Sequence, residues 1–123
     1  MLYLFTIALN EAIKAHGEWK MKLRGAIQSQ STLDVTTIAR DDCCALGKWL
    51  HGESRARFGA LASHKECIKQ HAVFHKQAAQ VATAINNGQY PEAEKMLGAG
   101  TPYIAASQAV VMAIGTLKRE AGL

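Results

Sequence analysis

The sequence predicts an all-α domain, an antiparallel four-helix-bundle-like fold with one short extra helix. Apolar residues recur every three or four positions over long stretches, which is the helical period. Hydrophobic residues make up 49% of the chain and only two residues are proline, so helices can form and bury a core. No stretch alternates apolar and polar residues strongly enough to compete as a strand. The length fits a single domain over residues 1–123.

The first helix is predicted from about Leu2 to Gln28. Its apolar stripe also holds His16, a polar ring on an otherwise apolar face. Residues 28–37 follow, and their Ser and Thr content predicts a loop. The apolar members of the stripe are Leu2, Phe5, Leu9, Ala12, Ile13, Leu23 and Ile27.

A short extra helix is predicted next, running to about Leu50. Asp41 or Asp42 is suited to cap its start, because a carboxylate accepts hydrogen bonds from free backbone N–H groups. The pair His51-Gly52 is suited to end it. This helix carries Cys44 in its first turn.

A long helix is predicted from about Ser54 to Ile85, stopped by Asn86-Asn87-Gly88. Pro91 opens a short helical segment to Leu97. Thr101-Pro102 then provides a cap followed by proline at the first helical position, and the last helix reaches about Glu120. Three long helices and one or two short ones result.

Charge and composition narrow the class of protein. The formal net charge is +4, and the basic residues are scattered without interleaved aromatics, which argues against nucleic-acid binding. The apolar start, residues 1–9, is far shorter than a membrane span and lacks the features of a signal peptide, so we expect a cytoplasmic protein. Three cysteines suit metal or redox chemistry in a reducing compartment better than a disulfide framework.

Histidines at helical spacing indicate a metal site. His71 and His75 are four residues apart, so both imidazoles lie on one helix face and can reach one ion. The pair alone is weak evidence, because a core histidine can also be satisfied by a backbone carbonyl. His16 lies on the apolar face of another predicted helix, and a shared ion would satisfy all three rings.

Cys44 supplies a candidate fourth ligand. At the start of a short helix, free N–H groups and the helix dipole favour a thiolate. Three imidazoles and a thiolate select Zn²⁺ over Mg²⁺ or Ca²⁺ and close its tetrahedron, leaving no open position for a substrate water. We therefore expect a zinc protein that is not an enzyme. The Glu-x-x-His pairs of di-iron bundles and the C-x-x-C-H of c-type haem attachment are absent from the sequence.

Spacing leaves other ligands open. Cys67 lies four residues before His71 and could pair with it in place of His75. Cys43 is expected to point away from the site as packing or a reserve thiol. His64 is expected in the core or at its rim, and His51 is expected to be exposed at a helix end. Asp41 or Asp42 could also accept the second N–H of a ligand imidazole.

The motifs His16-Gly-Glu-Trp19, Cys44-Ala-Leu-Gly47-Lys-Trp49 and His71-x-x-x-His75 together resemble the chemoreceptor zinc-binding domain. The order of the motifs and the lengths between them fit this family over residues 16–75. The resemblance implies that His16, Cys44, His71 and His75 bind the zinc, and it favours His75 over Cys67. It also implies that Trp19, Gly47 and Trp49 form the framework around the site, with Gly47 allowing close contact between helices.

The resemblance implies a role as well. Such domains look like cytoplasmic regulatory units of chemoreceptors or diguanylate cyclases, folded as antiparallel bundles and often homodimeric. No signalling hairpin or cyclase sequence is recognisable, so we expect either a free-standing module or part of a longer receptor. Zinc level or oxidation of Cys44 could be the stimulus, and zinc affinity is expected to fall as the pH drops through about 6.5. The alternative is a structural zinc that holds the bundle in shape for dimerisation or partner docking.

Overall fold

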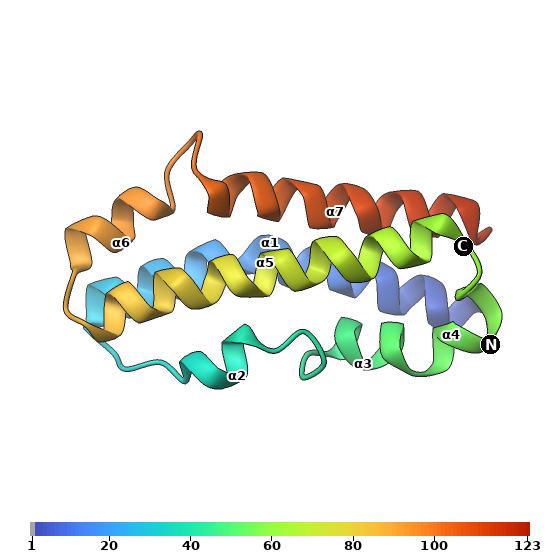
Figure 1. The fold of residues 1–123 in the computed structure, drawn as a ribbon, viewed down its shortest axis with the longest axis horizontal. Coiled ribbons are helices and arrows are strands. Elements are labelled where there is room, and N and C mark those ends of the chain that lie inside the picture. Colours follow the sequence, from blue (N-terminus) through green and yellow to red (C-terminus); the bar gives the residue numbers. More distant parts are fainter. Residues whose placement is uncertain (1) are drawn as a thin grey trace.

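Three long helices lie lengthwise beside one another in the computed structural model, which describes residues 2–123 (Figure 1). They are α1 (Leu2–Ser29), α5 (Ala62–Asn86) and α7 (Pro102–Glu120). Four shorter helices complete the described chain, which contains no strand. These are α2 (Val35–Ala39), α3 (Ala45–His51), α4 (Glu53–Phe58) and α6 (Tyr90–Met96).

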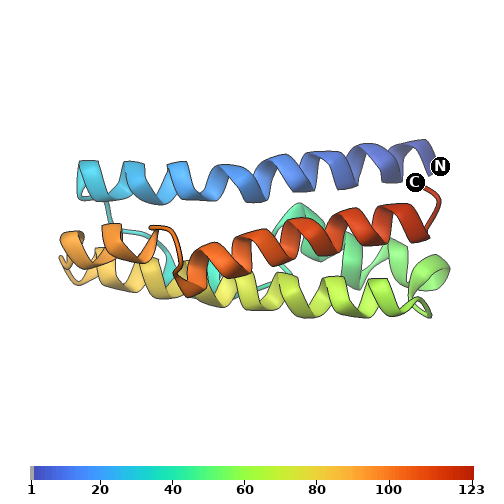
Figure 2. The ribbon, with the colours of Figure 1, turned by 90° about the horizontal axis from the view of Figure 1, so that it is seen from above.

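The short helices α2, α3 and α4 take the place of a fourth long helix. They return the chain along the length of the bundle between α1 and α5, while α7 runs opposite to both long helices (Figures 1 and 2). Contacts join α1 to α7, α7 to α5, α5 to α2 and α3, and α3 to α1. The three long helices and the segment of short helices therefore surround a common core, as the four helices of a bundle do. The predicted all-α, antiparallel four-helix-bundle-like fold is therefore confirmed, with its second helix broken into pieces.

The core runs along the axis between α1, α5 and α7. Ring contacts such as Phe74 against Tyr103, with centroids 5.7 Å apart, lie in the same interior. The two ends of the chain meet at one end of the bundle, where the Thr6 hydroxyl donates to the Leu123 carbonyl. Fully buried apolar side chains from the three helices are Leu9, Leu23, Phe74, Val81, Ile85, Val110, Ile114 and Leu117.

The stretch predicted as a loop over residues 28–37 is wrong in its last part, because α2 begins at Val35. Asp34 caps this helix: its carboxylate accepts from the Thr37 N–H and the Thr37 hydroxyl. Five residues are too few to show a helical period, so the cap was the only local signal of α2. Ile38 is buried and anchors α2 on the bundle.

The long helix predicted from Ser54 to Ile85 is also wrong, because it is two helices, α4 and α5, separated at residues 59–61. The chain must reverse here, since α2–α4 and α5 run in opposite directions (Figure 1). The buried Ser54 hydroxyl fixes α4 against α3 by donating to the Trp49 carbonyl, and it lies 2.8 Å from Nε2 of His64 on α5. Tertiary contacts therefore override the helical period.

The start of α3 differs from prediction, whereas its end and the start of α7 agree. Cys44, and neither Asp41 nor Asp42, is the N-cap residue of α3. The helix ends at His51 with Gly52 as its C-cap, and Thr101 caps α7 through a bond from the Ile104 N–H, both as predicted.

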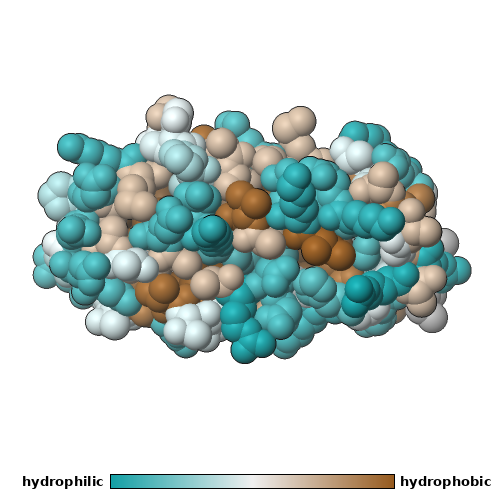
Figure 3. Space-filling view, in the orientation of Figure 1, coloured by the Kyte–Doolittle hydropathy of each residue, from teal (hydrophilic) through white to brown (hydrophobic). Residues whose placement is uncertain are grey.

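The surface over α5, seen in Figure 3, is mainly hydrophilic, with apolar surface confined to small separate patches. Within residues 2–123, no helix combines the length and the apolar character that crossing a bilayer demands.

Candidate metal centre

His71 and His75 lie on the buried face of α5, one turn apart, and both side chains are almost fully enclosed. Their ring centroids are 4.4 Å apart and their Nε2 atoms approach to 2.9 Å. This is the geometry expected for residues i and i+4 of one helix. Two imidazole nitrogens therefore converge on one point inside the bundle.

The turn before α3 brings Cys44 to the same point. Its Sγ lies 3.1 Å from His71 Nε2 and 3.6 Å from His75 Nε2. As the N-cap residue, Cys44 also accepts a hydrogen bond from the Gly47 N–H at 3.4 Å. The short helix thus holds the sulfur in place and directs a backbone donor at it, which favours negative charge there.

His16 on α1 completes the cluster from the opposite side. Its ring centroid lies 5.0 Å from that of His71 and 5.9 Å from that of His75. Its Nδ1 lies 2.7 Å from the Ala12 carbonyl, and its Nε2 is buried with no hydrogen-bond partner in residues 2–123. A buried nitrogen in that state costs roughly 1–3 kcal/mol unless another group satisfies it.

The four residues fit a tetrahedral zinc ion. One ligand atom from each of them lies within 4.8 Å of all the others. Bond lengths of about 2.0–2.1 Å to nitrogen and about 2.3 Å to sulfur require edges of about 3.3–3.6 Å, so small side-chain shifts suffice. Three nitrogens and one sulfur suit Zn²⁺, and a bound ion would satisfy the free Nε2 of His16.

The second ring nitrogens show how each imidazole is oriented. His16 and His75 use Nδ1 on backbone carbonyls, those of Ala12 and Ile38, at 2.7 and 2.9 Å. His71 Nδ1 is buried and has no partner among the described residues. Donation to a carbonyl at Nδ1 leaves Nε2 unprotonated and ready to bind metal.

The partner predicted for one of these rings, Asp41, lies elsewhere. Its carboxylate Oδ2 is 3.1 Å from Nε2 of His51, and Asp42 pairs with Arg40. The Ile38 carbonyl takes the role instead. Sequence could not identify it, because any residue at that position carries the same backbone oxygen.

Burial controls the protonation of the site. Desolvation lowers the pKa of His71 to about 3 and also lowers the pKa of His16 and of His75. His71 therefore stays neutral far below pH 6.5, and all three imidazoles are neutral at pH 7, as metal binding requires. Protonation of the imidazoles is thus not a cause of the expected loss of affinity through about pH 6.5, because that pKa belongs to an exposed histidine.

The Cys44 thiol was predicted to be a thiolate, but its pKa is raised. Burial raises the pKa of Cys44, although hydrogen bonds from the Gly47 and Leu46 N–H groups act against that shift. The helix start alone therefore does not make a thiolate, and the charge of a metal ion is needed to deprotonate the sulfur.

The remaining candidates lie outside the cluster. Cys67 is fully buried, and burial raises the pKa of its thiol to about 12. Cys43 points at the Asp42 carboxylate, 3.7 Å away. His64 lies in the core, as one of the predicted alternatives, and contacts the Ser54 hydroxyl. The His51 side chain is only about one-third exposed and pairs with Asp41, so the prediction that it is exposed is wrong.

The framework residues surround the site in different ways. Trp49 is buried with its ring 5.4 Å from that of Phe5, and Trp19 is half-buried with the Lys22 ammonium 5.2 Å above its ring. A Cβ on Gly47 would collide with the backbone of Asp41. The close contact at Gly47 is therefore with the turn before Cys44 rather than with another helix.

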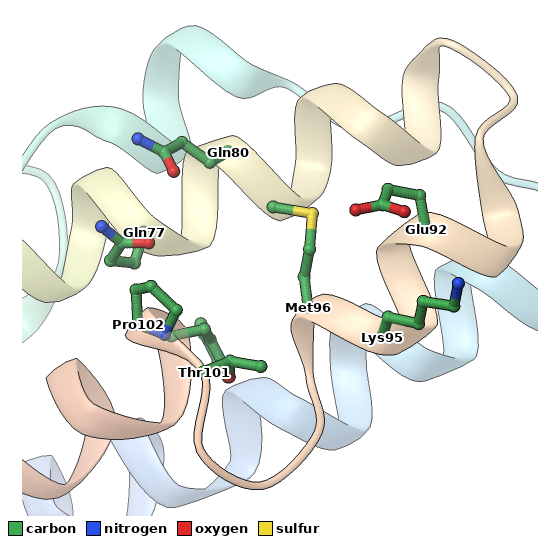
Figure 4. Close-up of a pocket in the computed structure, with 8 residues that line it drawn as sticks. Gln77, Gln80, Glu92, Lys95, Met96, Thr101 and Pro102 are labelled. Atoms are coloured by element: carbon green, nitrogen blue, oxygen red, sulfur yellow. The ribbon is translucent and has the colours of Figure 1, made fainter.

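Three cavities help to place the cluster. One of about 340 Å³ lies between α1 and α3 and is lined in part by His16 and Cys44. A smaller one of about 160 Å³ lies near α2 and reaches Cys43, Cys44 and His75. A third, of about 330 Å³, lies between α5, α6 and the start of α7, lined by residues such as Gln77 and Met96 (Figure 4). No ligand residue lines the third cavity, so it is separate from the metal centre.

Comparison with known proteins agrees with this geometry. The pattern of the chemoreceptor zinc-binding domain family matches residues 16–82. No curated protein and no solved structure matches the chain. The family and the cluster of three histidines and one cysteine together imply zinc binding. Because the match covers more than half of the 123 residues and includes all four ligand residues, this chain belongs to the chemoreceptor zinc-binding domain family.

Proposed function

We propose that this domain is a regulatory zinc module of bacterial signalling, of the chemotaxis or cyclic-di-GMP type. His16, Cys44, His71 and His75 would hold the zinc. One observation carries the proposal: these four donors from three separate segments converge within 4.8 Å in the interior of the bundle. The set is closed, so we propose a sensory rather than a catalytic role.

The arrangement suits regulation because the site joins the segment of short helices to two of the long helices. His71, His75 and His16 lie on the long helices, whereas Cys44 lies in the segment of short helices. A bound ion would tie that segment to α1 and α5, and its loss would free the turn at Cys44. A signal requires two states of this kind with different zinc affinities.

Two stimuli fit this arrangement, zinc level and thiol oxidation. Cys44 is half-buried and faces the small cavity near α2, so a small oxidant can approach its sulfur. Hypochlorous acid would transfer its oxygen to the Cys44 thiolate, giving a sulfenic acid and releasing chloride. The sulfenic acid is a weaker zinc ligand, so the segment would loosen.

The partners proposed here follow from the family. We propose that the domain acts in the cytoplasm as a homodimer, with a chemoreceptor or a diguanylate cyclase as its output partner in the same chain or in another. The family is described by zinc binding in chemoreceptors and not by a catalytic reaction, which supports a role other than that of an enzyme.

A structural role for zinc is the second candidate, favoured by the burial of all three imidazoles. Chelation separates the two. The core of α1, α5 and α7 contains many fully buried apolar side chains away from the site, so regulation predicts an apo form that stays helical and loosens only over residues 30–61. An apo form that unfolds completely supports a structural zinc.

Metal analysis tests the site itself. We expect one zinc per wild-type chain and strongly reduced zinc in His71→Ala and Cys44→Ser, with Cys43→Ser as the matched control that keeps zinc. Oxidant added to the zinc-loaded wild type should release the metal. If Cys44→Ser binds zinc tightly and still releases it on oxidation, the cysteine mechanism is wrong.

A further inference from the structure

The cavity of about 340 Å³ between α1 and α3 is larger than the metal centre needs. His16 and Cys44 line only one part of it, whereas Ala8 and Ala15, seven residues apart on α1, show that it extends about 10 Å along the helix. An apolar cavity of about 150 Å³ is enough to hold a benzene molecule. This cavity therefore has room for an organic molecule beside the zinc.

The lining of the cavity is mainly apolar. Apart from His16, Cys44, Glu11 and Lys22, it consists of alanine, leucine and tryptophan side chains. Glu11 and Lys22 are both exposed and carry opposite charges, so together they favour neither an anion nor a cation. A molecule that enters this cavity is therefore selected mainly by its apolar surface.

Trp49 supplies the cavity with a buried hydrogen-bond donor. The residue is 7% exposed, and its indole Nε1 is buried with no hydrogen-bond partner within residues 2–123. The Trp49 ring packs against the rings of Phe5 and Phe58, and neither of these offers an acceptor. Of the three cavities described above, Trp49 lines only this one. An acceptor atom held in the cavity would satisfy the N–H group, which is costly to bury unpaired.

We propose that this cavity is a second binding site, for a small and mainly apolar molecule with one acceptor oxygen, such as a ketone or an ether. The oxygen accepts a hydrogen bond from the Trp49 indole N–H, and the apolar part packs on the alanines of α1. The inference goes beyond the zinc-dependent role proposed above and does not rest on it.

The position of the site beside the zinc ligands has a consequence for the metal centre. A molecule in the cavity lies between α1 and α3 and covers the side of Cys44 that faces them. The smaller cavity near α2 reaches Cys44 from another direction and stays open. The bound molecule therefore touches the metal centre without closing it.

Nuclear magnetic resonance tests the site directly, because the chain has two tryptophans and both line this cavity. The ¹⁵N-labelled, zinc-loaded protein is titrated with acetophenone, a small aromatic ketone. We expect a saturable downfield shift of the Trp49 indole proton, since hydrogen bonding moves its resonance in that direction. Ethylbenzene, which has a similar shape but no oxygen, should bind without that downfield shift. The variant Trp49→Phe assigns the resonance.

The same variant measures the hydrogen bond. The preference for acetophenone over ethylbenzene, taken as the ratio of their dissociation constants, should fall about threefold to tenfold in Trp49→Phe, because one neutral hydrogen bond is lost. Comparing two probes in one variant separates this loss from the effect of the smaller ring on packing. Trp19→Phe makes the same change at the other tryptophan of the cavity, and it should leave the preference nearly unchanged.

The possible results lead to different conclusions. Acetophenone that fails to shift the Trp49 resonance, or shifts it without saturation, would overturn the site, and so would an unchanged preference in Trp49→Phe. If Trp49→Phe does not fold, the wild-type titrations with the two probes decide. Zinc content measured in the same samples reports on the metal centre independently, so a wild type that binds acetophenone but no zinc would overturn the metal centre and leave the second site.

Discussion

His51 Nε2 lies 3.1 Å from Oδ2 of Asp41, which ties the end of α3 to the turn that precedes it. Asp41 and His51 lie ten residues apart, and Cys44 and Gly47 lie between them in the sequence. Both side chains are about one-third exposed, so the pair adds little stability by itself. Its effect is positional, because it holds the turn that directs the Cys44 sulfur at the imidazoles.

Replacing His51 should therefore weaken zinc binding without touching a ligand. We expect His51→Ala to lower zinc affinity about tenfold, the lower range of effects seen for groups that support ligands. Competition with a chromophoric chelator at pH 7.5 measures this. Lys48→Ala, an exposed residue on the same helix, is the control and should bind like wild type. Equal affinities for both variants would show that Asp41–His51 does not position Cys44.

Gly47 should tolerate no side chain. A Cβ there would collide with the Asp41 backbone, so Gly47→Ala must displace the turn and with it Cys44. We expect a loss of about 1–3 kcal/mol in the unfolding free energy and weaker zinc binding. Gly17→Ala is the matched control, because nothing lies within 4 Å of its Cβ.

The control should change in the opposite direction. Gly17 is inside α1, where alanine is favoured over glycine by about 0.5–1 kcal/mol. Urea denaturation and zinc titration of both variants measure the two effects. If Gly47→Ala binds zinc as wild type does, the close contact with Asp41 is not needed for the site.

The four ligand residues and the three long helices could be predicted because each follows a strong local pattern. The heptad-like stripes place His16, His71 and His75 in the core, and the motif around Cys44 adds the sulfur. The short helices could not be predicted in the same way. Helix α2 has only five residues, which is too short for a helical period. The break before α5 depends on the reversal of the chain and on the Ser54–His64 contact, and both form only when the chain folds.

The hydrogen-bond partners of the ligands and the pKa of Cys44 could not be predicted from the sequence either. Asp41 was a reasonable partner for a ligand imidazole, but the backbone carbonyl of Ile38 takes that role because α2 packs against α5. The raised pKa of Cys44 likewise depends on burial, which outweighs the helix start. Both outcomes are set by packing and not by residue type.

Cys67 should be dispensable for zinc, which tests the alternative that spacing left open. Its thiol is fully buried outside the cluster. We expect Cys67→Ala to keep one zinc per chain, with only about 1 kcal/mol lost from the small cavity. Cys44→Ala should lose tight binding. Zinc loss in Cys67→Ala with a folded bundle would make Cys67 a ligand in place of His75.

The apo protein should lose stability in acid. Burial lowers the pKa of His71 to about 3 and lowers the pKa of His16, His64 and His75, whereas all four titrate near 6.5 when unfolded. Above about pH 6.5 both states are neutral and stability is at its full value. Below it the unfolded state binds more protons, so stability falls as the pH drops from about 6.5 toward 3.

Each histidine that stays neutral contributes a slope of about 1.4 kcal/mol per pH unit in that range. Urea denaturation of the chelator-treated protein from pH 7.5 to 4.5 measures it. The variant His71→Gln removes the group with the pKa of about 3, so its stability should change less steeply with pH. Parallel curves for wild type and variant would show that His71 is already protonated in the folded apo state.

Zinc binding at pH 7 should release close to one proton, and that proton should come from Cys44. Burial raises the pKa of the Cys44 thiol and keeps the three imidazoles neutral, so only the sulfur has a proton to lose. Zinc affinity should accordingly rise about tenfold per pH unit between pH 6 and 8. Calorimetry in buffers of different ionisation enthalpy counts the protons. Cys44→Ala should release almost none, and a release of two or more by the wild type would mean that imidazoles are charged in the apo site, contrary to the burial that the fold imposes on them.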